Sequence, residues 1–176
     1  MRRIVLLLAT FAVLAGCSPQ PAAQAPSPPP SPSAPPPASA QPPPDPQPAG
    51  AGPCPYLDTS FVADANGQHV SKVQTSSDKP HPACFFYALN GKLQLTVQVY
   101  VGDPAVAKAL VDKAAPLTTS NPATDPAGWQ GGYEPTDAGA VYAVAKAGTA
   151  IVVTTNQKQT VKARTVAKQT ISGLGL

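Results

Sequence analysis

Three cysteines and two histidines are the residues of this 176-residue sequence that could most directly carry chemistry. The histidines, His69 and His81, lie in no recognisable nucleophile motif, and no Gly-x-Ser-x-Gly sequence accompanies them. They also lack the His-x-x-x-His spacing that places two metal ligands on one face of a helix. The sequence therefore indicates no catalytic residue, no metal site and no cofactor, and it favours a protein that is not an enzyme.

The first cysteine, Cys17, follows a segment with the features of an export signal. Met1–Arg3 supplies positive charge, and Ile4–Leu14 is an apolar run of about eleven residues. Such a run is too short to span roughly 30 Å of hydrocarbon as a helix. We therefore expect residues 1–16 to be a signal peptide that is removed after export, and not a permanent transmembrane helix.

The sequence Leu14-Ala15-Gly16-Cys17 resembles the lipobox of bacterial lipoproteins. The resemblance implies that Cys17 receives a diacylglycerol, with palmitate-type acyl chains, and becomes the new N-terminus. Each buried methylene contributes about 0.8 kcal/mol, so two or three acyl chains give a stable attachment. We therefore expect a lipid-anchored protein on the extracytoplasmic face of the cell membrane.

The segment that begins with the lipobox cysteine, residues 17–53, is dominated by proline and alanine. Of the 24 prolines in the chain, 17 lie between Pro19 and Pro55, and Asp45 is the only charged residue between Ser18 and Pro53. A segment of this kind buries too little apolar area to offset the entropy of ordering, so we expect a disordered tether. Its proline runs favour the extended polyproline II conformation of a spacer, and a docking ligand for a polyproline-recognising partner is the alternative.

The remaining cysteines, Cys54 and Cys84, belong to the folded part that we expect over residues 54–176. Two cysteines in an oxidising compartment most simply pair, so we expect a disulfide between them. A reactive thiol at Cys84, with His81 three residues before it, is the competing interpretation.

Turn signals and periodicity predict an α+β domain: one antiparallel sheet built from two hairpins, with helices packed on one face. Asn90-Gly91 predicts a type I′ turn with positive φ at both residues. Alternation in the strand after it predicts an apolar face at Leu93, Leu95, Val97, Val99 and Val101 and a wet face between them. The expected elements are a helix from Asp58 to Gly67, an extended segment His69–Thr75, a hairpin of 83–89 and 92–101, a helix after Asp103-Pro104, a loop over 116–137, a hairpin of 140–146 and 149–155, and a last helix opened by an Asn156–Gln159 capping box.

The last helix has a basic side that is a candidate partner surface. At 100° per residue its apolar side chains fall opposite the cations Lys158, Lys162, Arg164 and Lys168. Trp129 and Tyr133 lie among glycines and could join this surface, although Trp129 also fits as a lid over the core. Envelope proteins and anionic wall polymers are the candidate partners. The formal charge of +3 is too small to indicate nucleic acid.

The frame from Cys54-Pro-Tyr-Leu through Cys84-Phe-Phe and Gly128-Trp129-Gln to Thr155-Asn-Gln resembles exported actinobacterial lipoprotein domains of unknown function. The resemblance covers the expected folded part. It implies an envelope lipoprotein and brings no established reaction, cofactor or catalytic residue. The sequence thus favours a lipid-anchored binding module; the alternatives are a small envelope-processing hydrolase that uses His69 or His81, and a carrier of an apolar ligand.

Overall fold

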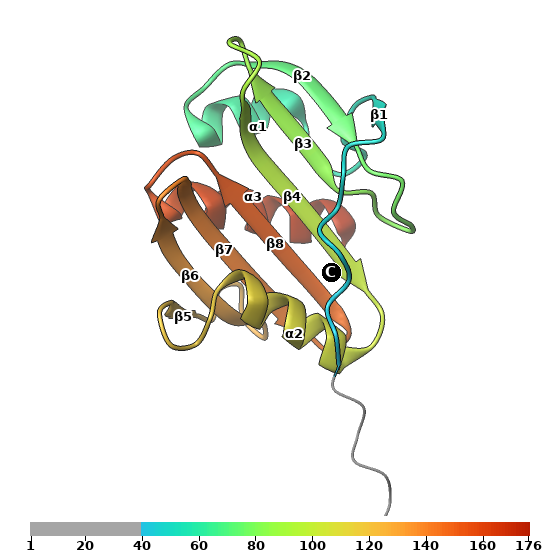
Figure 1. Cartoon of the computed structure of the whole chain (residues 1–176), viewed down its shortest axis with the longest axis vertical. Helices are drawn as coiled ribbons and strands as arrows, with labels where there is room; N and C mark the ends of the chain where they lie inside the picture. Colours follow the sequence, from blue (N-terminus) through green and yellow to red (C-terminus); the bar gives the residue numbers. More distant parts are fainter. Residues whose placement is uncertain (1–39) are drawn as a thin grey trace, which may run out of the picture. The chain divides into compact units, whose positions relative to one another are not determined.

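The computed structural model describes residues 40–176, which form one sheet with three helices (Figure 1). The expected signal peptide, the lipidation site Cys17 and the first part of the tether lie outside these described residues. In chain order the elements are β1 (Gly50–Ala51), α1 (Thr59–Asn66), β2 (Val70–Thr75), β3 (Cys84–Ala88), β4 (Leu93–Val101), α2 (Pro104–Ala114), β5 (Asn121–Ala123), β6 (Gln130–Thr136), β7 (Gly139–Lys146), β8 (Thr149–Thr155) and α3 (Thr160–Leu174). None of these helices is long and apolar enough to cross a membrane.

The sheet is a single antiparallel array of eight strands in the order β1-β2-β3-β4-β8-β7-β6-β5. The two expected hairpins, β3–β4 and β7–β8, lie at its centre. They are joined by β4 and β8, which pair from Leu95 opposite Thr155 to Val101 opposite Thr149. The description of a sheet built from two hairpins is therefore incomplete, because β1 and β2 extend it on one side and β5 and β6 on the other.

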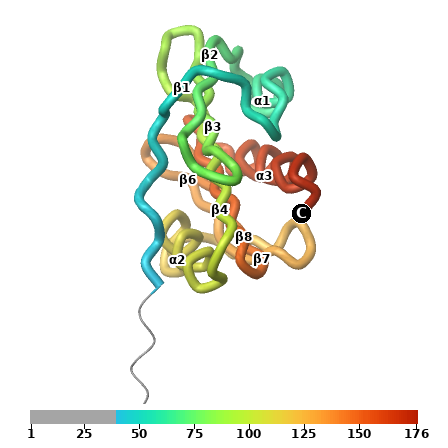
Figure 2. The backbone as a smooth tube through the Cα atoms, turned by 90° about the vertical axis from the view of Figure 1, so that its right-hand side faces the viewer, coloured from blue at the N-terminus to red at the C-terminus, as the bar shows by residue number. Residues whose placement is uncertain are grey.

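Helices cover both faces of the sheet, which corrects the expectation that they pack on one face only. Figure 2 shows α1 and α3 on one side, and α2 with the incoming chain on the other. Val166 of α3 lies in one apolar core with Val144 and Val153, whereas Leu110 of α2 lies in a second core with Ala143. The physical reason is visible in β7 and β8, whose almost continuous apolar sequence indicates strands that are buried on both faces.

The first two helices begin where capping side chains predict. The Asp58 carboxylate accepts a hydrogen bond from the Ser60 N–H at 2.7 Å, and Gly67, with φ of 69°, ends α1. The Asp103 carboxylate accepts one from the Ala105 N–H at 2.7 Å, with proline at the first helical position. The third helix differs: α3 starts at Thr160 with no side-chain cap, so the expected capping box is not formed.

The turn between β3 and β4 lies at Asn90-Gly91 as predicted, but it is not a type I′ turn. Only Gly91 has a positive φ, at 73°. The backbones of Ala88 and Lys92 are hydrogen-bonded, so the loop contains three residues with glycine in the left-handed position. The Asn90 side-chain oxygen accepts a bond from the Lys92 N–H at 3.0 Å and stabilises this turn instead.

A β-bulge interrupts the predicted alternation at the start of β4. The register with β3 leaves Gln94 as an extra residue on β4. The bulge leaves Leu93 45% exposed and buries Gln94, which is 1% exposed. The apolar face predicted for this strand therefore holds from Leu95 to Val99 and fails at its ends.

Residues 116–137 are not a continuous loop, because β5 and β6 lie within this segment. Gly131 pairs with β7, and a Cβ atom built on it would lie 2.0 Å from the main-chain oxygen of Ala143. The glycines that suggest a loop in the sequence therefore permit two strands to approach closely.

Residues 45–52, which composition places in the tether, lie on the domain; we call them the strap. The Ala49 N–H donates to the Thr75 carbonyl at 2.9 Å, and the Gly52 N–H to the Val73 carbonyl at 3.3 Å. The Asp45 carboxylate contacts the Lys113 ammonium of α2 at 2.6 Å. Composition does not reveal this segment, because most of its partners are main-chain groups at the edge of β2.

The disulfide between Cys54 and Cys84 is present as expected, and it ties the chain just after the strap to β3. Both cysteines are buried, Cys84 completely. Closure of a loop of this length stabilises a fold by roughly 3 to 4 kcal/mol in the chain-entropy account. In the disulfide form Cys84 carries no thiol.

Gly131→Ala should lower the free energy of unfolding by about 1–3 kcal/mol, because the added methyl group forces β6 away from β7. Gly50→Ala is the matched control, since a Cβ atom there meets nothing within 4 Å. Urea unfolding followed by tryptophan fluorescence measures both variants. Equal stability of the two would contradict the close approach of β6 and β7.

Candidate functional site

The four cations expected on the partner surface are not equally free, because two of them are bound within the chain. The Lys162 ammonium donates to the main-chain oxygen of Asn66 at 2.8 Å and so caps the end of α1. The Lys168 ammonium pairs with the Asp125 carboxylate at 3.1 Å. Lys158 and Arg164 are exposed and have no ion pair within the described part of the chain.

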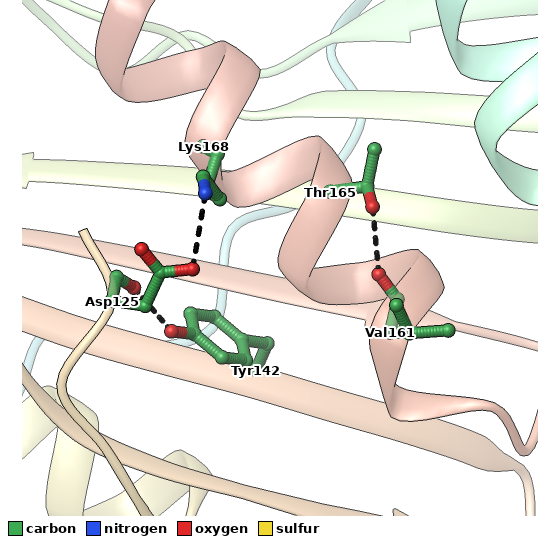
Figure 3. Close-up of polar contacts among 5 residues, drawn as sticks. All are labelled: Asp125, Tyr142, Val161, Thr165 and Lys168. Carbon is green, nitrogen blue, oxygen red and sulfur yellow. Dashed lines mark hydrogen bonds and ion pairs between the residues drawn. The ribbon is translucent and has the colours of Figure 1, made fainter.

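The two aromatic residues of the expected surface are largely buried. Trp129 is 2% exposed and belongs to the core, so it is a lid and contributes no partner surface. Tyr133 is half-buried and stacks on Tyr142, with ring centroids 6.2 Å apart. The Tyr142 hydroxyl donates to the main-chain oxygen of Asp125 (Figure 3). Burial raises the pKa of Tyr142, and the nearby Asp125 carboxylate raises it further.

The histidines lie in different surroundings. His69 lines an open hollow of about 490 Å³ together with Asp58 and Ser60. The Ser60 hydroxyl donates to the Asp58 carboxylate at 2.6 Å, and these hydrogen bonds hold the pKa of Asp58 below its ordinary value. His81 packs edge-on against Tyr56, with ring centroids 6.4 Å apart. In the described part of the chain no hydrogen bond joins a histidine ring to a serine, and no group of three potential ligands is placed to hold a metal ion.

A buried polar network includes Thr155, the last residue of β8. Asn66 is completely buried, and its amide donates to the Gln94 side-chain oxygen at 2.9 Å. The Thr155 hydroxyl donates to the Asn66 side-chain oxygen, and the Gln94 amide donates to the His69 carbonyl at 3.0 Å. Because these groups satisfy one another, the network fixes α1 on the sheet and presents no site for a ligand.

A groove lies on the sheet face that α2 leaves uncovered. It has a volume of about 390 Å³ and is open to solvent. One wall is α2, and the other is formed by Asp45 and Pro46 of the strap. The floor combines apolar and polar side chains from β3, β4, β7 and β8: Phe85, Thr96, Gln98, Val141, Val152 and Thr154.

A second hollow of about 230 Å³ continues this groove toward the end of β8. The two share Thr96, Thr136, Val141 and Thr154, so together they form one trough across the sheet. Its hydroxyl and amide groups can hydrogen-bond a ligand, while the partly exposed Pro46 and Ala114 at its walls can contact apolar groups. The sequence predicts the wet face of β4, but not that α2 and the strap form walls around it.

Comparison with protein families gives a match over residues 36–176, to a family described as Domain of unknown function (DUF2020). The chain belongs to this family. No curated protein matches the sequence. The DUF2020 match begins before the strap, so the strap is part of the DUF2020 domain, whereas the boundary expected from composition is at Cys54.

In the DUF2020 domain, Lys162→Met should lower the free energy of unfolding by about 1 kcal/mol, because it removes the charged hydrogen bond to the last carbonyl of α1. Lys158→Met, on the same basic side, should change it by less than about 0.5 kcal/mol. Urea unfolding measures both. Equal effects of the two substitutions would contradict a stabilising hydrogen bond from Lys162 to the end of α1.

Proposed function

We propose that this chain is a non-catalytic binding module of the bacterial cell envelope. In this proposal Cys17 carries the lipid that holds it on the extracytoplasmic face of the membrane, and the DUF2020 domain binds an extended segment of an envelope protein in the groove beside α2. The lipobox, the proline-rich tether and the resemblance to exported actinobacterial lipoproteins support the location. The observation that carries the binding role is the open groove between α2 and the strap.

The shape and the chemistry of the groove suit a polypeptide. It is open to solvent, and the adjoining hollow extends it across the sheet, so an extended chain can lie along it. Threonine and glutamine side chains on its floor can bond main-chain groups, and the partly exposed Pro46 and Ala114 at its walls can contact apolar side chains. The strap shows that an extended segment with prolines rests on this face, since Asp45 and Pro46 form one wall.

The basic side of α3 supports a partner less well. Of its four cations, Lys162 and Lys168 are engaged within the chain, which leaves Lys158 and Arg164 for an external anion. Each free cation near an anionic surface contributes about 1 kcal/mol, so two give only weak retention on a wall polymer. We therefore place the partner in the groove.

Peptides selected from a displayed random library on the purified chain should bind in the groove. Thr96→Arg and Thr154→Arg each place a long charged side chain in it, so each should weaken the selected peptides at least tenfold in fluorescence anisotropy. Thr165→Arg, on the outer side of α3, is the matched control and should leave binding unchanged (Figure 3).

Two results would overturn the proposed binding role. One is a set of selected peptides that bind equally well to the Thr96→Arg, Thr154→Arg and control variants. The other is hydrolysis of peptide or wall substrates by the purified chain with loss of the activity in His69→Ala, which would favour the hydrolase.

Mass spectrometry of the mature protein from its native membrane should find an N-terminus at Cys17 that carries a diacylglycerol. Cys17→Ser should abolish the added mass and release the protein from the membrane fraction. Detection of an unmodified Cys17 thiol on a membrane-free protein would contradict the anchor and leave the groove proposal intact.

A further inference from the structure

We infer that the strap is an internal substitute for a partner strand. In this inference the surface beneath the strap belongs to the binding site, and an extended segment of a partner protein displaces residues 45–52 when it binds. The inference deepens the proposed function and rests on it for the adjoining groove. The partner is an extended segment with an acidic residue, then prolines, and then residues that pair with β2, in the same order as in the strap.

The strap is held by few contacts, and each of them is weak or local. The ion pair between Asp45 and Lys113 joins side chains that are 72% and 47% exposed. Exposed pairs of this kind contribute about 0 to 1 kcal/mol. β1 has two residues, both exposed, and its neighbours Ala49 and Gly52 add single main-chain bonds to β2. A segment held in this way can leave the sheet without unfolding the core.

The strap leaves side-chain positions empty along the edge of β2. A Cβ atom built on Gly50 or Gly52 meets nothing within 4 Å, whereas one on Gly131, within the sheet, would lie 2.0 Å from a main-chain oxygen. Side chains at these two positions would therefore face open space, and glycine there adds no contact and leaves the backbone free to leave the extended conformation. A partner strand with β-branched residues at these positions can make the same main-chain bonds with a smaller loss of backbone entropy.

The strap and the groove form one continuous surface. Asp45 and Pro46 form a wall of the groove, and the chain then runs beside β4 to the edge of β2 (Figure 1). Removal of the strap opens that wall and frees the Val73 and Thr75 carbonyls together. A single extended segment can then occupy the groove and pair with β2.

The order of contacts along the strap gives the chemistry of the partner. The acidic residue, Asp45, contacts Lys113, and the strand that pairs with Gln74 and Thr75 begins about five residues later, at Gly50. Prolines in between favour an extended chain that loses little entropy when it binds. We therefore expect a partner segment with an acidic residue, an extended proline-containing stretch and then apolar or β-branched residues.

A fluorescent peptide with the sequence of residues 42–53 and the changes Gly50→Val and Gly52→Val tests this inference in anisotropy measurements. The receptor is the chain from Ser18 onward. The altered peptide should bind about tenfold more tightly than the unaltered one, because valine favours the extended backbone and loses less entropy than glycine on binding. Asp45→Lys in the receptor should raise the affinity of the receptor for the altered peptide by up to about fivefold, since the substitution weakens the competing strap by at most about 1 kcal/mol.

A charge exchange identifies the contact with α2. Asp45→Lys in the peptide should weaken binding to the original receptor, and Lys113→Asp in the receptor should restore binding of this peptide. Lys108 lies on the same helix and forms another exposed ion pair, with Asp112. The control variant Lys108→Asp should therefore not restore binding of the charge-reversed peptide. Hydrogen exchange at the Ala49 and Gly52 amides of the receptor should quicken when the altered peptide binds, because the strap has left β2.

The outcomes separate this inference from the proposed function. The inference alone would be overturned by selected peptides with three properties. Their binding depends on Thr96, the altered peptide does not compete with them, and they leave the Ala49 and Gly52 amides protected from exchange. Binding of the altered peptide that depends on Lys113, with no selected peptide that depends on Thr96, would overturn the floor of the groove as a binding site and keep the strand exchange. Failure of the altered peptide to bind, or a charge exchange without effect, would overturn the inference directly.

Discussion

The antiparallel pairing of β4 with β8 is the contact on which the domain depends, because it joins two hairpins that lie far apart in the sequence. Its register is fixed at one end by side chains. The bulge at Gln94 turns this residue toward α1, where it meets Asn66, and Asn66 in turn accepts from Thr155 at the end of β8. A shift by one residue would separate these groups and reverse every side chain of β8 between the two cores. A buried network of amides and a hydroxyl therefore specifies the pairing that apolar contacts stabilise.

The groove follows from the lengths of the elements that this pairing brings together. The eleven residues of α2 extend about 16 Å, whereas the nine residues of β4 extend about 30 Å. One helix of this length cannot cover the whole face, and the residues that it leaves uncovered are mainly threonine and glutamine, which tolerate water. On the opposite face α1 and α3 together cover the apolar residues. The asymmetry of the two faces is thus a consequence of helix length, and it gives one face a place for a partner.

Local signals in the sequence predict local structure well here. Asp58 and Asp103 mark helix starts, and Asn90-Gly91 marks a turn, because each acts through bonds to residues a few positions away. Long-range features are missed for a physical reason. Gly131 lies in a strand because Ala143 approaches it, and the strap is ordered because carbonyls of β2 accept its N–H groups. Neither partner is visible from the composition around the residue itself, and the same holds for the walls of the groove.

A strap in the same chain as its binding surface sets a threshold for any competing strand. Short linkage gives an effective concentration in the millimolar range, so an untethered partner at micromolar concentration is at a disadvantage unless its own contacts are stronger. Empty positions at Gly50 and Gly52 keep the contacts of the strap few, which lowers this threshold. The proposed lipid anchor acts in the same direction, because it confines the domain and a membrane-bound partner to one surface and raises their local concentration. A weak internal strand and a membrane anchor together would thus favour partners that share the membrane over soluble segments of similar sequence.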